Sequence, residues 1–165
     1  MEILELISSL EKSPAFKKWQ QSNKKSFLMY CFNIVEDHVF RQWNIGYYSK
    51  KKIKVFVQTD KGFELSEECD PTQTGQPIKP LKMERVKVNT MQALEKAFKL
   101  IKEEYPKVDS PKTIIILQNI KIGQIWNLTF IGRAFDILNI KIDAETGKIL
   151  EHSSKPFIKF SSGAS

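Results

Sequence analysis

The chain has 165 residues, which is enough for one ordinary domain or two very small ones. Hydrophobic residues make up 41% of it and charged residues 27%, a balance that is typical of globular proteins and excludes an intrinsically disordered chain. The net charge of +7 is concentrated in residues 71–165, where 15 Lys and Arg face 9 Asp and Glu. Such a bias favours association with acidic partners.

We expect no targeting signal in this chain. Residues 1–5 are acidic and lack the positive n-region and apolar stretch of a secretory signal, and no apolar run approaches the ~18 residues of a membrane-spanning helix. Cys31 lies in an apolar run and Cys69 in a polar loop, which argues against a disulfide framework. We therefore expect a cytoplasmic protein.

The first half reads as two short helices followed by strands. Apolar residues at helical spacing predict a helix over 3–10, and Ser13 with Pro14 predicts the start of a second helix that runs to about residue 22. Residues 26–35 are apolar at nearly every position, which predicts a strand that is covered on both faces.

Alternating patterns then predict a strand over 39–48, with Trp43 on its inner side, and a strand around Ile53, Val55 and Val57. We expect this aliphatic row to pack beneath the helix. A Gly-containing turn at residues 60–62 leads into a short return strand.

The second half repeats this plan after a Pro-rich loop. Asn89 and Gln92 form a potential capping box, and the helix that follows places Met91, Leu94, Phe98, Ile101 and Tyr105 on one stripe before Pro106 ends it. Strands are predicted at 113–120, around Trp126 and over 138–142, with a hairpin at 143–147.

Three matches indicate an internal duplication. Residues 42–45 (Gln-Trp-Asn-Ile) match 125–128 (Ile-Trp-Asn-Leu) at a shift of 83, the aliphatic row 53, 55, 57 matches 138, 140, 142 at a shift of 85, and residues 15–17 match 97–99 at a shift of 82. The short hairpins exclude a parallel sheet. The sequence therefore predicts an α+β fold of two tandem units, each a helix with three or four antiparallel strands. The predicted boundaries are 1–68, a linker at 69–87, 88–152, and a tail at 153–165.

The second unit resembles a PepSY domain. The resemblance rests on the helix at 90–105, the Ile-Trp-Asn-Leu strand at 125–128, and the ending at 143–150, where a strand reaches an aspartate and a small turn closed by Thr-Gly leads to a return strand. It covers about residues 88–152, and residues 14–68 follow it in outline, with a topology that is cystatin-like in outline. The resemblance implies a non-catalytic module. PepSY domains are often extracytoplasmic, and some lie in protease propeptides.

Histidine and cysteine, which often act as catalytic residues in enzymes, are few and isolated in this sequence. His38 and His152 lie in or beyond turns, and the apolar neighbours of Cys31 indicate an inert packed thiol. Acidic neighbours disfavour the thiolate of Cys69, and the acidic run at 67–70 lacks the spacing and glycine of a calcium loop. We expect no enzyme activity, no metal and no cofactor.

Two sets of residues remain as candidates for a partner surface. Asn44 and Asn127, if both lie on outer faces, could line a shared groove. Lys50, Lys51, Lys52 and Lys54 form a basic turn beside aromatic residues, a mixture found on nucleic-acid surfaces. The leading hypothesis is a binding or regulatory module with a protein partner. The alternatives are a nucleic-acid-binding protein that uses the basic hairpin, and a small-molecule site between the repeats; a homodimer is also possible.

Overall fold

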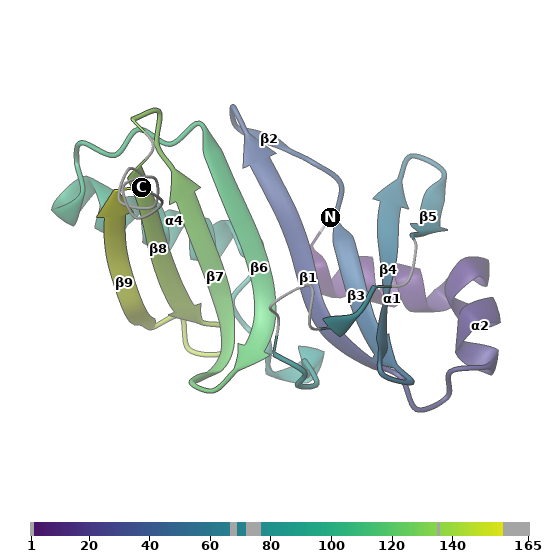
Figure 1. Cartoon of the computed structure of the whole chain (residues 1–165). Coiled ribbons are helices and arrows are strands. Elements are labelled where there is room, and N and C mark those ends of the chain that lie inside the picture. The colour runs from purple at the N-terminus through teal and green to yellow at the C-terminus, as the bar shows by residue number, and fades with distance from the viewer. Residues whose placement is uncertain (1, 67–68, 72–76, 135, 157–165) are drawn as a thin grey trace, which may run out of the picture.

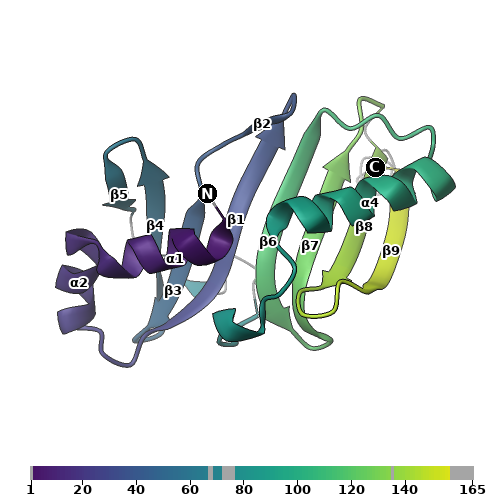
Figure 2. The same cartoon turned by 180° about the vertical axis from the view of Figure 1, so that it is seen from behind.

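A computed structural model describes residues 2–66, 69–71, 77–134 and 136–156. One antiparallel sheet runs through the whole molecule in the order β5-β4-β3-β1-β6-β7-β8-β9, with β2 paired to β1 (Figure 1). Helices α1, α2 and α4 lie together on one face of this sheet (Figure 2), and none of these three helices lies on the opposite face. The predicted α+β fold with antiparallel strands is confirmed.

The elements follow the predicted order along the chain. The helices are α1 (Ile3–Lys12), α2 (Pro14–Gln21), the 3-10 helix η1 (Met83–Arg85) and α4 (Thr90–Glu104). The strands are β1 (Phe27–Glu36), β2 (Val39–Phe40), β3 (Asn44–Ser49), β4 (Lys52–Thr59), β5 (Gly62–Leu65), β6 (Lys112–Ile120), β7 (Gly123–Ile131), β8 (Asp136–Asp143) and β9 (Ile149–Pro156). No described helix is long and apolar enough to cross a membrane.

Polar residues start the helices where the sequence predicts. The Phe16 N–H donates to Ser13 Oγ at 3.2 Å, and Pro14 occupies the first position of α2. At α4, Gln92 N donates to Asn89 Oδ1 at 2.8 Å and Asn89 N donates to Gln92 Oε1 at 2.9 Å. This reciprocal pair is the predicted capping box.

Replacing Asn89 with alanine removes the acceptor for the Gln92 N–H. We expect the free energy of unfolding to fall by about 1 kcal/mol, measured by urea denaturation monitored by circular dichroism. Asn89→Asp is the matched control, because its carboxylate still accepts that hydrogen bond and should leave stability nearly unchanged. An equal loss in both variants would contradict a capping role.

The buried face of α4 is rotated from the predicted stripe. Met91 and Phe98 are each 50% exposed, whereas Ala93, Ala97 and Leu100 are buried against the sheet. The two alanines carry no side-chain bulk beyond Cβ, so this face lets the helix backbone approach the strands closely.

The main core lies between the helices and the inner face of the sheet. Its members are apolar and almost fully buried, and include Leu6, Phe16, Ile45, Phe56, Leu94, Ile115, Trp126, Leu128, Phe130, Leu138, Ile140 and Ile142. A smaller cluster of Met29, Tyr30 and Ile53 packs on the opposite face of the sheet. It contacts Cys69, which pairs with Ile53 beside β4.

The strand registers show an internal pseudo-twofold relation between the repeats. Asn44 pairs with Phe32, and Asn127, its match in the second repeat, pairs with Ile116. Phe32 and Ile116 are therefore equivalent residues, and they pair directly with each other across β1 and β6. An antiparallel pair of equivalent residues lies on the axis that relates two copies. The repeats are thus joined side by side through their first long strands.

The expected match between the aliphatic rows is wrong by one residue. Val57 pairs with Asn44 and Lys141 pairs with Asn127, so the true shift of β4 onto β8 is 84 rather than 85. Because side chains alternate along a strand, a slip of one residue exchanges the two faces. Ile53, Val55 and Val57 therefore lie on the face opposite α1, α2 and α4, while Phe56 packs in the main core beside α2.

The match of residues 15–17 with 97–99 also has no structural basis. Phe16 is 2% exposed and packs its ring at a tilt against Trp19, Tyr47 and Phe56, whereas Phe98 is half exposed. In Figure 2, α1 crosses the first repeat's strands as α4 crosses those of the second.

The predicted linker and tail contribute to the fold. Within 69–87, Leu81 N donates to Leu28 O at 2.8 Å, and Lys82 exchanges hydrogen bonds with the Gln124 side chain. Strand β9 continues past residue 153, the expected start of the tail, to Pro156. The remainder of the predicted tail, residues 157–165, lies outside the described residues.

The hairpin before β9 has the expected turn. The N–H groups of Glu145 and Thr146 both donate to Asp143 Oδ1 at 2.8 Å, and Gly147 has a φ of 75°. Partial burial opposes ionisation of Asp143, but these two hydrogen bonds, together with the Thr146 side chain and the charge of Arg85, outweigh it and hold the pKa of Asp143 below the usual value.

Candidate functional site

A single cross-strand row contains both candidate asparagines. It lies on the face of the sheet opposite α1, α2 and α4, which we call the open face. The registers align Asn44 on β3, Phe32 on β1, Ile116 on β6 and Asn127 on β7. Their side chains point away from the helices, because the neighbouring Ile45, Cys31, Ile115 and Trp126 point into the main core. Three strand spacings separate the two asparagines, which is roughly 14 Å. We call these four residues the axial row.

Both amides of the axial row keep hydrogen-bonding capacity for a partner. Asn127 Oδ1 accepts from Asn139 Nδ2 at 2.7 Å, and Asn44 Nδ2 donates to Gln42 O at 3.0 Å. Within the described part of the chain, Asn127 Nδ2 and Asn44 Oδ1 make no hydrogen bond. One end of the row therefore offers a donor and the other an acceptor.

Apolar side chains widen the row into a patch. Six further half-buried residues alternate onto the same face: Ile34, Val55, Val57, Ile114, Ile131 and Ile137. None of α1, α2 and α4 lies over them (Figures 1 and 2). An exposed apolar patch of this kind is typical of an interaction site, because soluble proteins usually cover such surfaces.

Charges border the patch at the end of β1. Glu36 forms ion pairs with Arg41 at 2.7 Å and with Lys112 of the second repeat at 3.2 Å. The hydrogen bond from Arg41 and that from Lys112 hold the pKa of Glu36 below its usual value. The border thus combines a hydrogen-bonded carboxylate with two cationic groups.

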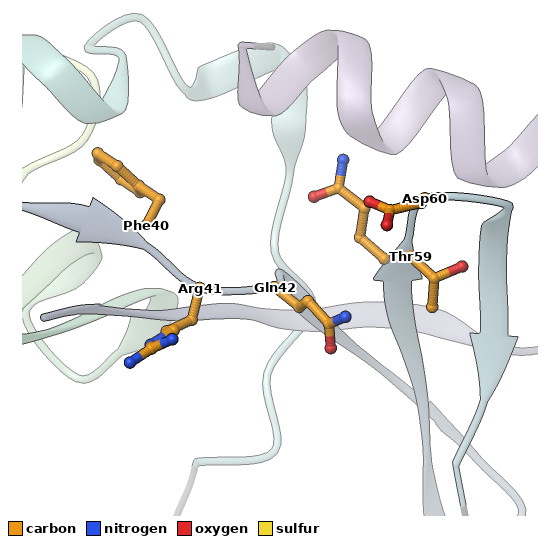
Figure 3. A pocket seen from close by; sticks show the side chains of 6 residues that line it. Phe40, Arg41, Gln42, Thr59 and Asp60 are labelled. Atoms are coloured by element: carbon orange, nitrogen blue, oxygen red, sulfur yellow. The ribbon is translucent and has the colours of Figure 1, made fainter.

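Two adjoining cavities lie at the same end of the sheet, where the chain crosses from β2 to β3. The larger, of about 590 Å³, is lined by Phe40, Arg41, Gln42, Gln58, Thr59 and Asp60. Figure 3 shows that Phe40 and Arg41 project to opposite sides of the chain. The smaller, of about 350 Å³, adds Glu2, Trp43, Thr90 and Met91. Since Thr90 and Met91 belong to α4, this second cavity lies between the repeats.

Neither asparagine lines these cavities. The asparagines lie on the open face, and the two cavities described above are built from other residues, so a small-molecule groove lined by Asn44 and Asn127 remains a prediction. The axial row itself joins the two asparagines through Phe32 and Ile116. Sequence analysis missed these two, although the doubled motif, combined with strand pairing, is the signal that locates them.

The lysines of the basic hairpin lie elsewhere. Lys50 and Lys51 form the β3–β4 turn with positive φ values of 50° and 63°, at the opposite end of β3 from Asn44. Lys52 and Lys54 alternate onto the helix side of the sheet, and Lys54 lines a shallow hollow with Trp19 and Leu65. A nucleic-acid surface built on these four lysines would not include the asparagines.

The potentially catalytic residues remain separate from one another. Cys31 is fully buried, which raises the pKa of its thiol. His152 Nδ1 shares a hydrogen bond of 2.7 Å with the Tyr105 hydroxyl, and His38 is exposed in the β1–β2 turn. Among the described residues, no three His, Cys, Asp or Glu side chains gather as metal ligands would. Residues 67 and 68 of the acidic run lie outside the described residues.

Comparisons with known proteins give a structural likeness alone. No family model matches the chain, and no curated protein matches it. A crystal structure of a "putative lipoprotein" from Clostridium difficile 630 superposes with a TM-score of 0.56 at 13% sequence identity, covering 86% of this chain and 90% of that one. At this identity the likeness shows the fold, which extends over both repeats.

Proposed function

We propose that this protein is a non-catalytic binding module, built from two PepSY-like repeats, whose open sheet face binds an apolar segment of a partner protein. The observation that carries the proposal is the axial row: two asparagines flank Phe32 and Ile116 on the face of the sheet opposite α1, α2 and α4. A partner segment could bury apolar side chains on the centre while its backbone amides bond to the outer amides.

The PepSY-like part of the proposal rests on the order of elements in each repeat. A helical segment precedes four consecutive antiparallel strands in both halves, if the two-residue β2 excursion is set aside. The second repeat also contains the Asp143 turn closed by Gly147 and a return strand. These features agree with the resemblance in the sequence.

Selection from a displayed library of random peptides tests the binding surface. Peptides selected on the wild-type protein should bind Ile116→Arg at least about tenfold more weakly, because an unpaired charge would then face apolar side chains. Ile122→Arg is the matched control, since Ile122 is already 42% exposed in the β6–β7 turn. Urea unfolding of each variant verifies that the fold is kept.

The outcome also separates the open face from the cavity between repeats. Peptides or small ligands that bind Ile116→Arg normally but lose affinity for Met91→Arg would place the site at that cavity, which both repeats form. Such a result would contradict the open-face proposal and favour small-molecule binding. Failure to select any binder would also count against it.

A further inference from the structure

Strand β9 is a long edge strand with one free side. It spans eight residues, from Ile149 to Pro156, of which all but Leu150 pair with β8, and no described strand pairs with its other side. Residues 151–156 are all exposed. The opposite edge of the sheet is different, because β5 has only four residues. Exposed edges of this length are templates for another strand unless they are blocked.

The hydrogen bonds at the end of β8 show which groups of β9 face outward. Asp143 N donates to Lys148 O, toward β9, whereas Ala144 N donates to Gln124 O, toward β7. The backbone N–H and C=O groups of successive residues in a strand point to opposite sides. The groups of residues 141, 139 and 137 therefore also point toward β9, where these residues pair with 151, 153 and 155. The N–H and C=O groups of His152 and Ser154 therefore point away from the sheet.

The outward backbone groups and the charged side chains of β9 are complementary to those of a second, antiparallel β9. We propose that β9 pairs antiparallel with β9 of a second copy of this chain, centred on Ser153. In this register His152 lies opposite Ser154 of the second copy, so their outward backbone groups bond to each other. Glu151 lies opposite Lys155 of the second copy, and Lys155 lies opposite Glu151 of the second copy, all on the open face.

The charges select this register over its neighbours. Centring the pair on residue 152 or 154 would place Glu151 opposite Ser153 or beyond the described strand, and both charge pairs would be lost. Glu151 already accepts from Lys141 Nζ at 3.0 Å, so it would lie between two lysines. Lys155 makes no ion pair in the single described chain and gains one by pairing.

The ends of β9 also fit a second copy. Pairing of β9 with β8 shifts register between Lys141 and Ile142, which leaves Leu150 as an extra residue. In the register centred on Ser153, Leu150 lies opposite Pro156, which has no N–H to donate. Regular pairing would therefore begin and end where the strand itself becomes irregular, and the dimer would carry one continuous open face.

Analytical ultracentrifugation over a range of concentrations tests the dimer. The wild-type protein should dimerise reversibly, and Ser154→Pro should abolish this because it removes an outward N–H while leaving the bonds to β8 in place. Lys155→Glu should weaken dimerisation about tenfold, since both charge pairs become repulsive.

Exchange of charges makes the test specific for the register. The double variant Glu151→Lys/Lys155→Glu should recover dimerisation, and a mixture of Lys155→Glu with Glu151→Lys should form heterodimers better than either variant alone forms homodimers. A monomer at all concentrations would overturn the proposal. So would a dimer that is insensitive to Ser154→Pro and to the charge exchanges.

Discussion

Replacing Trp126 with alanine is expected to lower the free energy of unfolding by about 3–5 kcal/mol. Trp126 is 0% exposed on β7, beneath the start of α4, and is the largest fully buried side chain of the core. Its indole N–H donates to Val88 O at 2.8 Å. The substitution therefore leaves a cavity and also leaves a buried carbonyl without its donor.

Two matched variants separate these contributions. Trp126→Phe retains an aromatic ring but removes the N–H, so its cost should be smaller, about 1–3 kcal/mol. Trp43→Ala replaces the equivalent residue of the first repeat, which borders the cavity between the repeats. Since that space is already open to water, we expect a smaller loss than for Trp126→Ala. Equal losses at the two tryptophans, measured by urea unfolding, would contradict this difference.

The two tryptophans also show what the sequence reveals and what it conceals. The doubled Trp-Asn motif predicted correctly that each tryptophan lies on the inner face and each asparagine on the outer face of its strand. The starts of the helices were equally predictable, because the side chains of Ser13 and Asn89 accept hydrogen bonds from N–H groups only three residues away. Such local contacts leave a local signature.

The pairing of strands that are far apart in the chain was harder to predict from the sequence. The continuous apolar run in β1 correctly indicated a strand, but the expected cover on both faces does not extend to Phe32 and Ile34, which are half-buried on the face opposite α1, α2 and α4. Nothing in the run specifies β6 as the neighbour of β1 in the sheet. The aliphatic row of β4 was assigned to the wrong face, since the alternation of aliphatic and polar residues favoured the row as the inner face, whereas the single Phe56 on the other face packs in the main core. Only the pairing of Phe32 with Ile116 completes the axial row, and strand pairing cannot be read from either residue alone.

A second large effect is expected at Gly46, where the repeats differ. A Cβ atom added to Gly46 would lie within 3.0 Å of three ring atoms of Tyr30, its partner across β3 and β1. The corresponding pair in the second repeat is Thr129 with Ile114. We expect Gly46→Thr to lower the free energy of unfolding by about 1–3 kcal/mol, because the Tyr30 ring has to leave its place over the glycine.

Titration of Tyr30 gives an independent measurement of this displacement. Burial, with smaller contributions from the nearby thiols of Cys69 and Cys31, raises the pKa of Tyr30 to about 12. A ring that moves toward solvent loses this desolvation, so its pKa should fall toward the ordinary value near 10. Ultraviolet difference spectra at alkaline pH should detect the fall in Gly46→Thr, with Tyr30→Phe identifying the signal.

Exchange of the whole pair tests whether Gly46 with Tyr30 and Thr129 with Ile114 fill the same space in the two repeats. The double variant Gly46→Thr/Tyr30→Ile gives the first repeat the pair that the second already contains. If the equivalence set by the strand registers is right, the smaller Ile side chain makes room for Thr, and the two losses should not add. Full additivity would contradict a direct contact. It would mean that the ring of Tyr30 and the glycine contribute to stability independently of each other.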